Sequence, residues 1–379
     1  MSVTPRLDIV HHFAAVQDPR DPRFTTHRLD DLLTIALCAT LSGSKSFEDM
    51  AVFGRVKEAW LRSLGLTLPH GIPSHDTFRD LFRHLPPAVF QDCFTAWINA
   101  ACARLGIEQV QIDGKALRGS RGLNGTCLHL VSAWVGAHSL TLGQVAVEDK
   151  SNEITAIPRL LKLLELHGAL VSIDAMGCQK EIAQAVRATG ADYLLQVKSN
   201  QPRLEADIAA SIEAAFAVDF VGIEHDLWVR ELRGHGRREE QVCLVLYNLE
   251  GLSTRAEWVD LQAIVRVART TWEGDQETFE VAHYICSRRG SAAELGSAIR
   301  GHWGIENGLH WVLDVIFRED DSRLKDRTAA ENLGMLRRVA VSLLRQDPSK
   351  GSTSGKLRRA AWDDEFRLHV LHLLSGESA

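Results

Sequence analysis

Hydrophobic positions along the first hundred residues recur at the spacing of an α-helix. The run LDDLLTIALCATLSG (29–43) places apolar side chains three and four residues apart and ends in Ser-Gly, which favours a helix that stops there. The run FEDMAVFGRVKEAWLRSLGL (47–66) repeats the pattern and closes on Gly65. Further on, Ser74 follows a proline and precedes an amphipathic run, as a helix N-cap does. We therefore predict an all-helical domain over residues 1–105.

After Gly106 the period of the pattern changes to that of strands. The runs VQID (110–113), LHLVSAWV (128–135) and LTLGQVAV (140–147) predict three strands joined by short turns. The chain then alternates between helical runs and short apolar runs, namely SNEITAIPRLLKLLEL, ALVSIDAM, CQKEIAQAVRATG, DYLLQVK and RLEADIAASIEAAF. This order, β-β-β-α-β-α-β-α, predicts an α/β fold with a mixed sheet that helices cover.

The alternation stops near residue 217. Three strand-like runs follow, VCLVLYNL, LQAIVRVART and ETFEVAHYICS, and they predict an all-β insertion. From Ser291 a long helical periodicity returns, and a Ser/Gly-rich linker precedes the last helix. The predicted divisions are a helical domain over 1–105, the first part of the sheet domain over 106–216, a β-rich insertion over 217–290, the second part over 291–348, and a linker with a C-terminal helix over 349–379.

Composition and charge narrow the class of protein. The 379 residues are enough for two or three domains of ordinary globular composition, with 45% hydrophobic residues. The 7 cysteines are dispersed and form no C-x-x-C pair, so we expect a reducing cytoplasm and neither a redox motif nor a cysteine zinc site. No apolar run approaches the ~18 residues that cross a bilayer, and no signal-peptide core is present, so we expect no membrane association.

The distribution of charge matters more than its sum. The formal net charge is -6, which on its own argues weakly against a nucleic-acid partner. From Arg288 to Arg359, however, Lys and Arg exceed Asp and Glu by five. This local excess is equally compatible with a solvated basic surface and with a surface that binds phosphates.

Two aspartates follow apolar runs directly. Asp113 ends VQID, and Asp174 stands in the same way in VSIDAM. The Gly114-Lys115 pair that follows is not a phosphate loop, because Gln109 occupies the position where that motif needs glycine. A carboxylate at a strand end commonly caps a helix or pairs with arginine. Two at one sheet edge would repel each other unless a cation lay between them, and oxygen ligands suit Mg²⁺ or Mn²⁺.

A third set of polar residues recurs every four positions in HWGIENGLHWVLDV. His302, Glu306, His310 and Asp314 form one stripe, which drifts by only ~40° per step on an α-helix. The stripe could be a solvent-facing side of the helix, but two interleaved tryptophans argue against full exposure. A zinc site is disfavoured, because no cysteine accompanies the histidines and the strand-end aspartates would be left unexplained.

Taken together, these stretches resemble the DDE transposases of bacterial insertion sequences, in the subgroup that includes the H-repeat-associated proteins. The similar stretches are DGKALRGS, KSNEITAIPRLL, IDAMGCQKEIA, DYLLQVKSNQ, GHGRREE and HWGIENGLHWVLDVIFRED, with HRLDDLLTIALCATLSG and GIPSHDTFRDLF in the N-terminal region. The resemblance spans nearly the whole chain. It implies a ribonuclease-H-like mixed sheet, interrupted by a β-rich insertion ahead of the helix that carries the catalytic glutamate.

The resemblance also implies the chemistry and the residues that perform it. Asp113, Asp174 and Glu306 are expected to be catalytic and to hold two Mg²⁺ or Mn²⁺ ions, with Asp113 bridging both. The expected reaction is metal-dependent cleavage of DNA at the ends of the element, followed by transfer of the 3′-hydroxyl into target DNA. Because two ends must be joined, a homodimer assembled on DNA is expected.

One part of the family pattern is absent. Many related transposases carry Tyr, Arg and Lys around the glutamate, where this chain has Ile299, His302 and Leu313. The groups that contact phosphate are therefore open, with Asp314 as a further candidate carboxylate. We expect sequence recognition from Ser74 to Arg83, which would form either a helix-turn-helix or a plain capped helix. We expect DNA contacts from the basic stretch Arg323 to Arg338. Further expected DNA contacts are Lys115, Arg118, Arg121, Lys198, His235, Arg237, Arg238, Arg300, His302, Asn307 and His310.

Three other functions remain open at this point. A metal-dependent nuclease with the same core would cut DNA without transferring strands. An inactive descendant would only bind DNA. A hydrolase that acts on sugars with two carboxylates would need no metal, so activity that survives a chelator would favour it.

Overall fold

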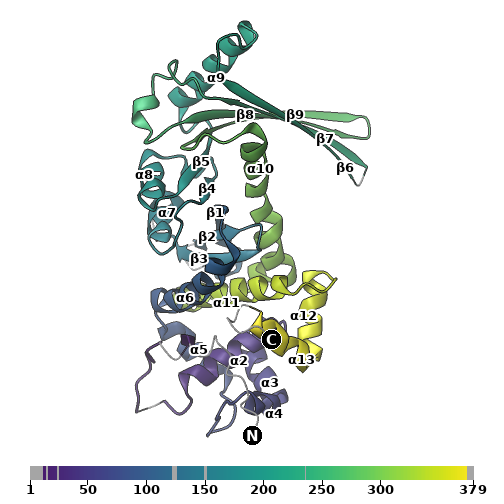
Figure 1. Ribbon diagram of the computed structural model, residues 1–379. Helices are drawn as coiled ribbons and strands as arrows, with labels where there is room; N and C mark the ends of the chain where they lie inside the picture. Colours follow the sequence, from purple (N-terminus) through teal and green to yellow (C-terminus); the bar gives the residue numbers. More distant parts are fainter. Residues whose placement is uncertain are drawn as a thin grey trace. The chain divides into compact units, whose positions relative to one another are not determined.

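The computed structural model describes residues 12–13, 16–23, 25–121, 126–148, 152–234 and 236–373, which form two compact units (Figure 1). The first unit consists of Met1–Ile107, Gly114–Asp149 and Glu306–Ala379, and the second of Glu108–Asp113 and Lys150–Ile305. The chain passes from one unit to the other directly after Asp113 and directly before Glu306. Two of the three predicted catalytic residues therefore stand at the junctions.

The N-terminal part of the first unit is helical, as predicted. It contains α2 (Leu29–Leu41), α3 (Phe47–Val56), α4 (Glu58–Ser63), α5 (His75–His84) and α6 (Pro87–Leu105). Helix α5 begins where the sequence predicts, since the Ser74 hydroxyl accepts the N–H of Thr77 at 3.3 Å. Several of these helices pack on the buried α11 (Arg327–Gln346), and α12 (Thr353–Trp362) and α13 (Asp364–His372) follow it.

Nine strands are hydrogen-bonded in the order β3-β2-β1-β4-β5-β9-β8-β7-β6. Strand β4 runs parallel to β1 and to β5, whereas β2 and β3 are antiparallel, as are the neighbouring pairs from β5 to β6. The predicted α/β fold with a mixed sheet and a helical N-terminal part is confirmed. The strands are β1 (Gln109–Leu117), β2 (Leu128–Val135), β3 (Leu140–Ala146), β4 (Leu170–Ile173), β5 (Asp192–Val197), β6 (His225–Gly234), β7 (Arg237–Leu246), β8 (Ala263–Glu273) and β9 (Gln276–Cys286).

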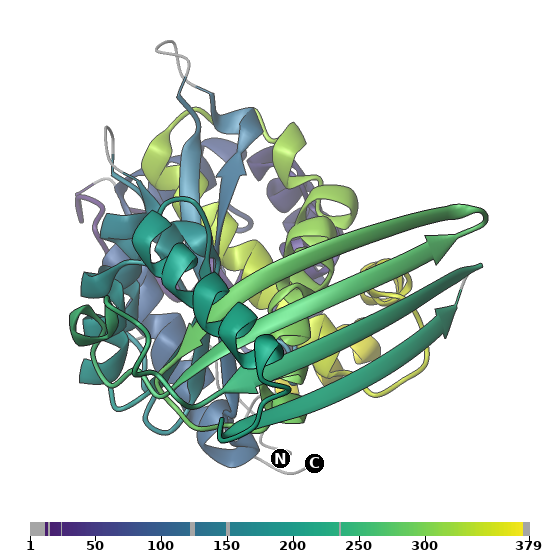
Figure 2. The ribbon, with the colours of Figure 1, turned by 90° about the horizontal axis from the view of Figure 1, so that it is seen from above.

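Helices cover the sheet of the second unit. Helices α7 (Glu153–Leu161) and α8 (Lys180–Ala188) pack on each other, and α9 (Pro202–Ala217) lies across the strands β6–β9 (Figure 2). Helix α10 (Ala292–His302) packs on β4, β6, β7 and β8, where its Leu295 and Ile299 join a buried apolar cluster. The strand that ends at Asp174 and the helix that precedes Glu306 therefore share one core.

Two predictions about elements were wrong. The sequence predicted three strands after residue 217 and missed β6, because HDLWVRELRG has only three consecutive apolar residues among charged ones. Among the described strands β6 pairs with β7 alone, so it needs no longer apolar run. The sequence also predicted one continuous α-helix through HWGIENGLHWVLDV. In the structure α10 ends at His302, and the wider turns of a π-helix follow at Glu306–His310 and Val312–Ile316. The predicted spacing of four residues thus only approximates the observed winding.

The division of the chain into five segments remains a prediction. No helix within the described residues is long and apolar enough to cross a membrane.

Candidate functional site

The first two predicted catalytic residues lie at the same edge of one sheet. Strands β1 and β4 pair in parallel up to Ile112 and Ile173, and Asp113 and Asp174 follow directly. Strand β1 itself continues to Leu117, so Asp113 ends the paired part of the strand rather than the strand. Because parallel strands in register carry equivalent residues to the same level, the two aspartates occupy equivalent positions at the carboxyl edge.

The charge of Asp174 is poorly compensated by the protein. Its carboxylate caps the short turn Ala175–Gly177 and accepts the Gly177 N–H at 3.3 Å. Burial nevertheless raises the pKa of Asp174, and the nearby carboxylate of Glu153 raises it further, against the lowering effects of the backbone N–H groups and of Lys198. A bound cation would reverse this shift, so the carboxylate fits a metal ligand.

A polar cluster lies beneath the two aspartates and connects their strands to α10. The Gln109 amide donates to Ser172 Oγ at 3.1 Å and to the Ala298 carbonyl at 2.7 Å. His302 Nδ1 lies 3.1 Å from Ser172 Oγ in a further hydrogen bond. The cluster therefore joins the end of α10 to Ser172, two residues before Asp174. His302, which is predicted to contact DNA, thus also forms a hydrogen bond within the protein.

The third predicted catalytic residue lies in the first unit beside a buried histidine. Glu306 begins a π-helical turn, and its side chain is 57% exposed. His310 Nδ1 lies 3.5 Å from Glu306 Oε2, with the imidazole buried. Asn307, predicted to contact DNA, is exposed in the same turn. The turn thus presents one carboxylate and one amide outward and keeps an imidazole behind them.

The basic residues beside Asp113 have different environments. Lys115 is buried, and its ammonium lies 2.6 Å from Asp314 and 3.4 Å from Asp320. The side chain of Arg118 is 82% exposed and lies 3.6 Å from Asp320, and Arg121 is exposed. Asp314, the predicted auxiliary carboxylate, is thus the partner of Lys115.

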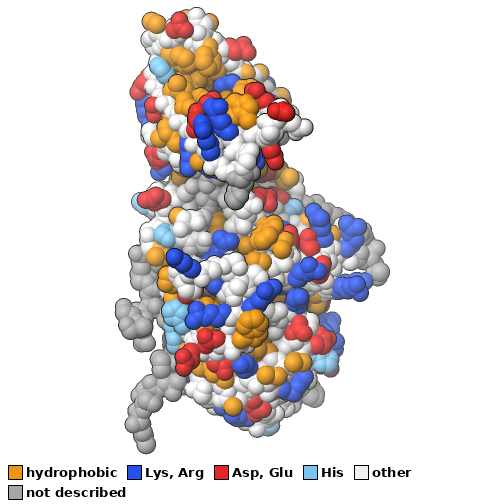
Figure 3. Space-filling view, turned by 90° about the vertical axis from the view of Figure 1, so that its right-hand side faces the viewer, with side chains coloured by type: hydrophobic (Ala, Val, Ile, Leu, Met, Phe, Trp, Pro, Cys, Tyr) orange, Lys and Arg blue, Asp and Glu red, His pale blue; other side chains and the backbone are white. Residues whose placement is uncertain are grey.

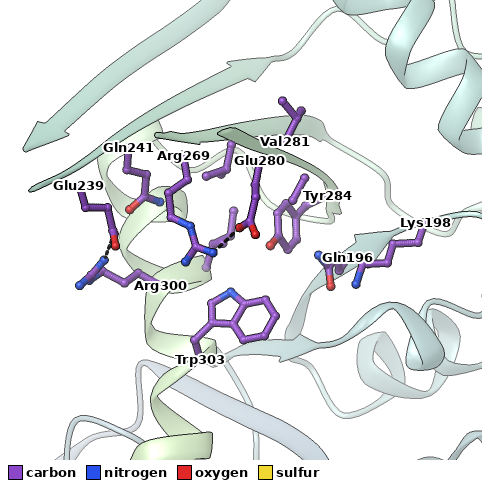
Figure 4. Close-up of a pocket in the computed structure, with 13 residues that line it drawn as sticks. Gln196, Lys198, Glu239, Gln241, Arg269, Glu280, Val281, Tyr284, Arg300 and Trp303 are labelled. Atoms are coloured by element: carbon purple, nitrogen blue, oxygen red, sulfur yellow. Dashed lines mark hydrogen bonds and ion pairs between the residues drawn. The ribbon is translucent and has the colours of Figure 1, made fainter. Parts of the chain in front are cut away.

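Two further predicted DNA contacts line a cavity of about 470 Å³ in the second unit (Figure 4). Lys198 is exposed at one side of it, and Arg300 of α10 pairs with Glu239 at 2.6 Å. The indole of Trp303 also faces this cavity. Lys198 therefore offers a charge to solvent, whereas the charge of Arg300 is already opposed by a carboxylate.

The loop between β6 and β7 is only partly described. His235 lies outside the described residues. Arg237 lies 3.4 Å from Glu239, and Arg238 pairs with Glu231 at 3.1 Å and stacks over the Trp272 ring at 4.5 Å. On the face shown in Figure 3, Lys and Arg side chains lie beside Asp and Glu side chains in several places.

Comparison with known families identifies the chain. The family model described as "Transposase DDE domain" matches residues 106–343, and the model described as "DDE_Tnp_1-associated" matches residues 10–98. The chain belongs to the DDE transposase family. Two relatives come from Escherichia coli. The "H repeat-associated putative transposase YhhI" of strain K12 is 34% identical over 96% of this chain and 97% of the relative. The "Putative transposase YncI" of strain O157:H7 is 35% identical over 98% of this chain and 95% of the relative.

A more distant likeness exists among solved structures. A piggyBac transposase synaptic complex with hairpin DNA matches with a TM-score of 0.40 and 11% identity, over 98% of this chain and 83% of the other. A likeness at that level does not bear on function.

One part of this transposase-family chain that was expected at DNA lies in the interior instead. Arg337 and Arg338, at the end of the predicted basic stretch, are buried and lie 3.9 Å and 3.1 Å from Glu319, which is fully buried. Arg338 also donates to Ser132 Oγ at 3.0 Å. Burial and pairing with Glu319 leave these two guanidinium groups unable to reach a phosphate in this fold.

Sequence reasoning missed four polar residues around the site. Gln109 and Ser172 look like ordinary strand residues, and Glu153 and Glu319 look like surface carboxylates in a linear reading. The sheet register is needed to place Gln109 and Ser172 next to the site. The burial of Glu153 and Glu319 appears only when the neighbouring elements are packed against them.

Proposed function

We propose that this chain is a transposase that cuts DNA at the ends of its element and joins the liberated 3′-hydroxyl to target DNA. The observation that carries the proposal is the register of β1 and β4, which sets Asp113 and Asp174 side by side in a chain of the DDE transposase family. Phosphodiester transfer needs oxygen ligands held rigidly at one edge, and paired strands provide that rigidity.

We further propose that divalent ions, Mg²⁺ or Mn²⁺, bind at these carboxylates. Asp113, Asp174 and Glu306 would hold the ions, and the imidazole of His310 lies beside Glu306. When bound, such ions activate the attacking hydroxyl and stabilise the leaving oxygen. The raised pKa of Asp174 supports this assignment, because a carboxylate that the protein leaves poorly compensated gains most from a cation.

The roles of the chain's other residues follow from their surroundings. Ser172 and Gln109 hold the strand that ends at Asp174, and His302 fixes the end of α10 to that strand. Several predicted DNA contacts are exposed to solvent, namely Arg118, Arg121, Lys198, Arg237, Arg238, Arg300 and Asn307. Because such contacts act through phosphates, DNA affinity should fall steeply as salt rises. The chain would act in the cytoplasm, where its DNA lies.

The test is a strand-transfer reaction with the purified protein. The DNA substrate carries the inverted repeats that flank the gene, and a supercoiled plasmid serves as target. We expect covalent joining of repeat ends to the plasmid with Mg²⁺, none with EDTA, and none for Glu306→Gln at equal DNA binding. Cleavage without joining would support the nuclease instead. Binding without cleavage would support an inactive descendant, and activity in EDTA would overturn the metal-dependent proposal.

A further inference from the structure

Strand β6 forms the last edge of the sheet. In the strand order of the described residues it pairs only with β7, and that pairing is unbroken over ten consecutive residue pairs. Figure 2 shows β6 at the outer side of the long ribbon that it makes with β7, β8 and β9. The outer edge of such a strand carries a row of backbone N–H and C=O groups directed away from the sheet, which can pair with another strand.

Strand β6 exposes apolar side chains at this edge. Leu227 and Val229 are 57% and 53% exposed. Proteins commonly protect an edge with charged side chains, proline or a bulge. His225–Gly234 contains no proline and has no break in its register with β7, and its charged residues are of both signs. The apolar surface also continues inward, since Val229 lies in one cross-strand row with Val242, Ala268 and Val281.

The sequence of β6 is complementary to itself in one antiparallel register. With a two-fold axis at Trp228, the pairs are Leu227 with Val229, Asp226 with Arg230, and His225 with Glu231 of the second copy, and each occurs twice by symmetry. Apolar side chains then meet apolar ones, and acidic side chains meet basic or imidazole ones.

Two registers with the axis further along the strand lack this match. An axis at Val229 places Leu227 opposite Glu231 and His225 opposite Arg233. An axis at Arg230 places two Arg230 side chains opposite each other, which repels. The position of Asp226 is fixed within the chain, because its carboxylate accepts the Ala292 N–H at 2.7 Å and the Leu227 N–H at 2.9 Å. Charge complementarity therefore selects both the partner and the register.

We propose that two copies of this chain associate through antiparallel pairing of their β6 strands about an axis at Trp228. The pairing joins the four strands β6–β9 of each copy into one continuous sheet, and it is closed, because each copy uses its only β6 edge. This association needs neither DNA nor a metal ion. It therefore stands or falls separately from the proposed chemistry.

The first test measures the mass of the full-length protein by light scattering, without DNA and in EDTA. The wild type should have the mass of two chains. Arg230→Glu should halve that mass, because it places two carboxylates opposite each other on both sides of the axis. The control is Phe279→Lys, which is 61% exposed on β9 and lies on the sheet face of Leu227 and Val229, and it should leave the dimer intact.

A monomeric wild type would overturn the proposal. Loss of the dimer in Phe279→Lys as well would also overturn it, because association would then use the sheet face instead of the edge. Circular dichroism of each variant shows whether it is folded. If Arg230→Glu fails to fold, Val229→Lys replaces it, with the same expected halving of the mass.

The second test determines the register. Leu227→Cys and Val229→Cys are prepared as separate proteins, mixed, and oxidised mildly. Directly opposite residues have Cβ atoms ~5 Å apart, close enough for a disulfide. A cross-linked dimer should therefore form in the mixture, well above the amount formed by either variant alone or by the wild type. Equal cross-linking in each single variant, or none in the mixture, would contradict the register with its axis at Trp228.

Discussion

At the scale of single residues, the proposed metal ligand Asp174 should also affect the stability of the metal-free protein. Its pKa is raised mainly by burial, so the folded chain without metal disfavours the charged form at neutral pH. A group with a raised folded-state pKa stabilises the fold at low pH, and this contribution is lost as the pH rises through the folded-state pKa. The carboxylate therefore destabilises the metal-free protein at neutral pH.

We predict that Asp174→Asn raises the melting temperature of the metal-free protein at pH 7 by about 2 °C and abolishes Mg²⁺-dependent DNA cleavage. The gain should shrink as the pH falls, because the wild-type carboxyl then becomes neutral as well. Thermal scans at several pH values in EDTA check this. A variant that is less stable than wild type at pH 7 would show that the carboxylate is already compensated within the protein.

The residues of the site differ in how far the sequence alone could place them. Asp113 and Asp174 were found from the sequence because a carboxylate directly after an apolar run is unusual and easy to see. The environment of Lys115 was not found, because its partner Asp314 is two hundred residues away and a lysine beside a candidate active site looks like a DNA contact. The sequence shows which residue types are present and how they are spaced. It does not show whether a carboxylate distant in sequence forms an ion pair with a given lysine.

At the scale of elements, the interior of the first unit depends on a charged group. Glu319 is fully buried, and it lies beside the buried guanidinium groups of Arg337 and Arg338 on α11. Removing one member of a buried charged cluster leaves the others uncompensated in a medium of low polarity, which is a large destabilising effect.

We predict that Glu319→Gln lowers the free energy of unfolding by about 3–5 kcal/mol, as measured by urea denaturation. The matched control is Asp321→Asn, two residues after Glu319, which removes the carboxylate that pairs with Arg318 at the surface. That surface pair should contribute no more than about 1 kcal/mol. Equal effects of the two substitutions would mean that the buried cluster is not a stabilising element.

A second element depends on a close approach of backbone to backbone. A Cβ on Gly119 would lie 2.1 Å from the Ser322 carbonyl oxygen and 2.6 Å from that of Asp320, the residue that pairs with Lys115. Backbone cannot move aside as a flexible side chain can, so only glycine fits between these segments.

We predict that Gly119→Ala lowers the free energy of unfolding by about 1–3 kcal/mol. Gly304→Ala is the matched control, because a Cβ there would have no neighbour within 4 Å, and it should change stability by less than about 1 kcal/mol. Urea denaturation of both variants provides the comparison. A neutral Gly119→Ala would show that the Asp320–Ser322 turn moves away at little cost.

The elements themselves were predicted unevenly, for physical reasons. Helix α5 was found because its N-cap serine and amphipathic face are local signals. Strand β6 was missed because an edge strand with little buried surface needs no continuous apolar run. The π-helical turns after His302 were missed because a repeat of four residues lies between the spacing of an α-helix and that of a π-helix, and packing decides between them.

At the scale of the whole molecule, the central claim is that Asp113, Asp174 and Glu306, distant in sequence, hold the same divalent ions. Asp113 and Asp174 are paired through β1 and β4, and Glu306 begins the segment that follows α10. The family assignment covers all three residues in one continuous match over 106–343. The measurement that tests this claim is whether the bound ions lie close to all three residues.

Oxidative cleavage by a substituted ion measures this directly. Fe²⁺ replaces Mg²⁺ at oxygen-ligand sites, and with ascorbate and peroxide it cuts the polypeptide close to where it is bound. We predict cuts near residues 113, 174 and 306 in the full-length protein, mapped by mass spectrometry. All three cuts should be suppressed by excess Mg²⁺ and weakened in Asp113→Asn. Cuts confined to other segments, or cuts at 113 and 174 that leave 306 intact, would contradict a shared metal site.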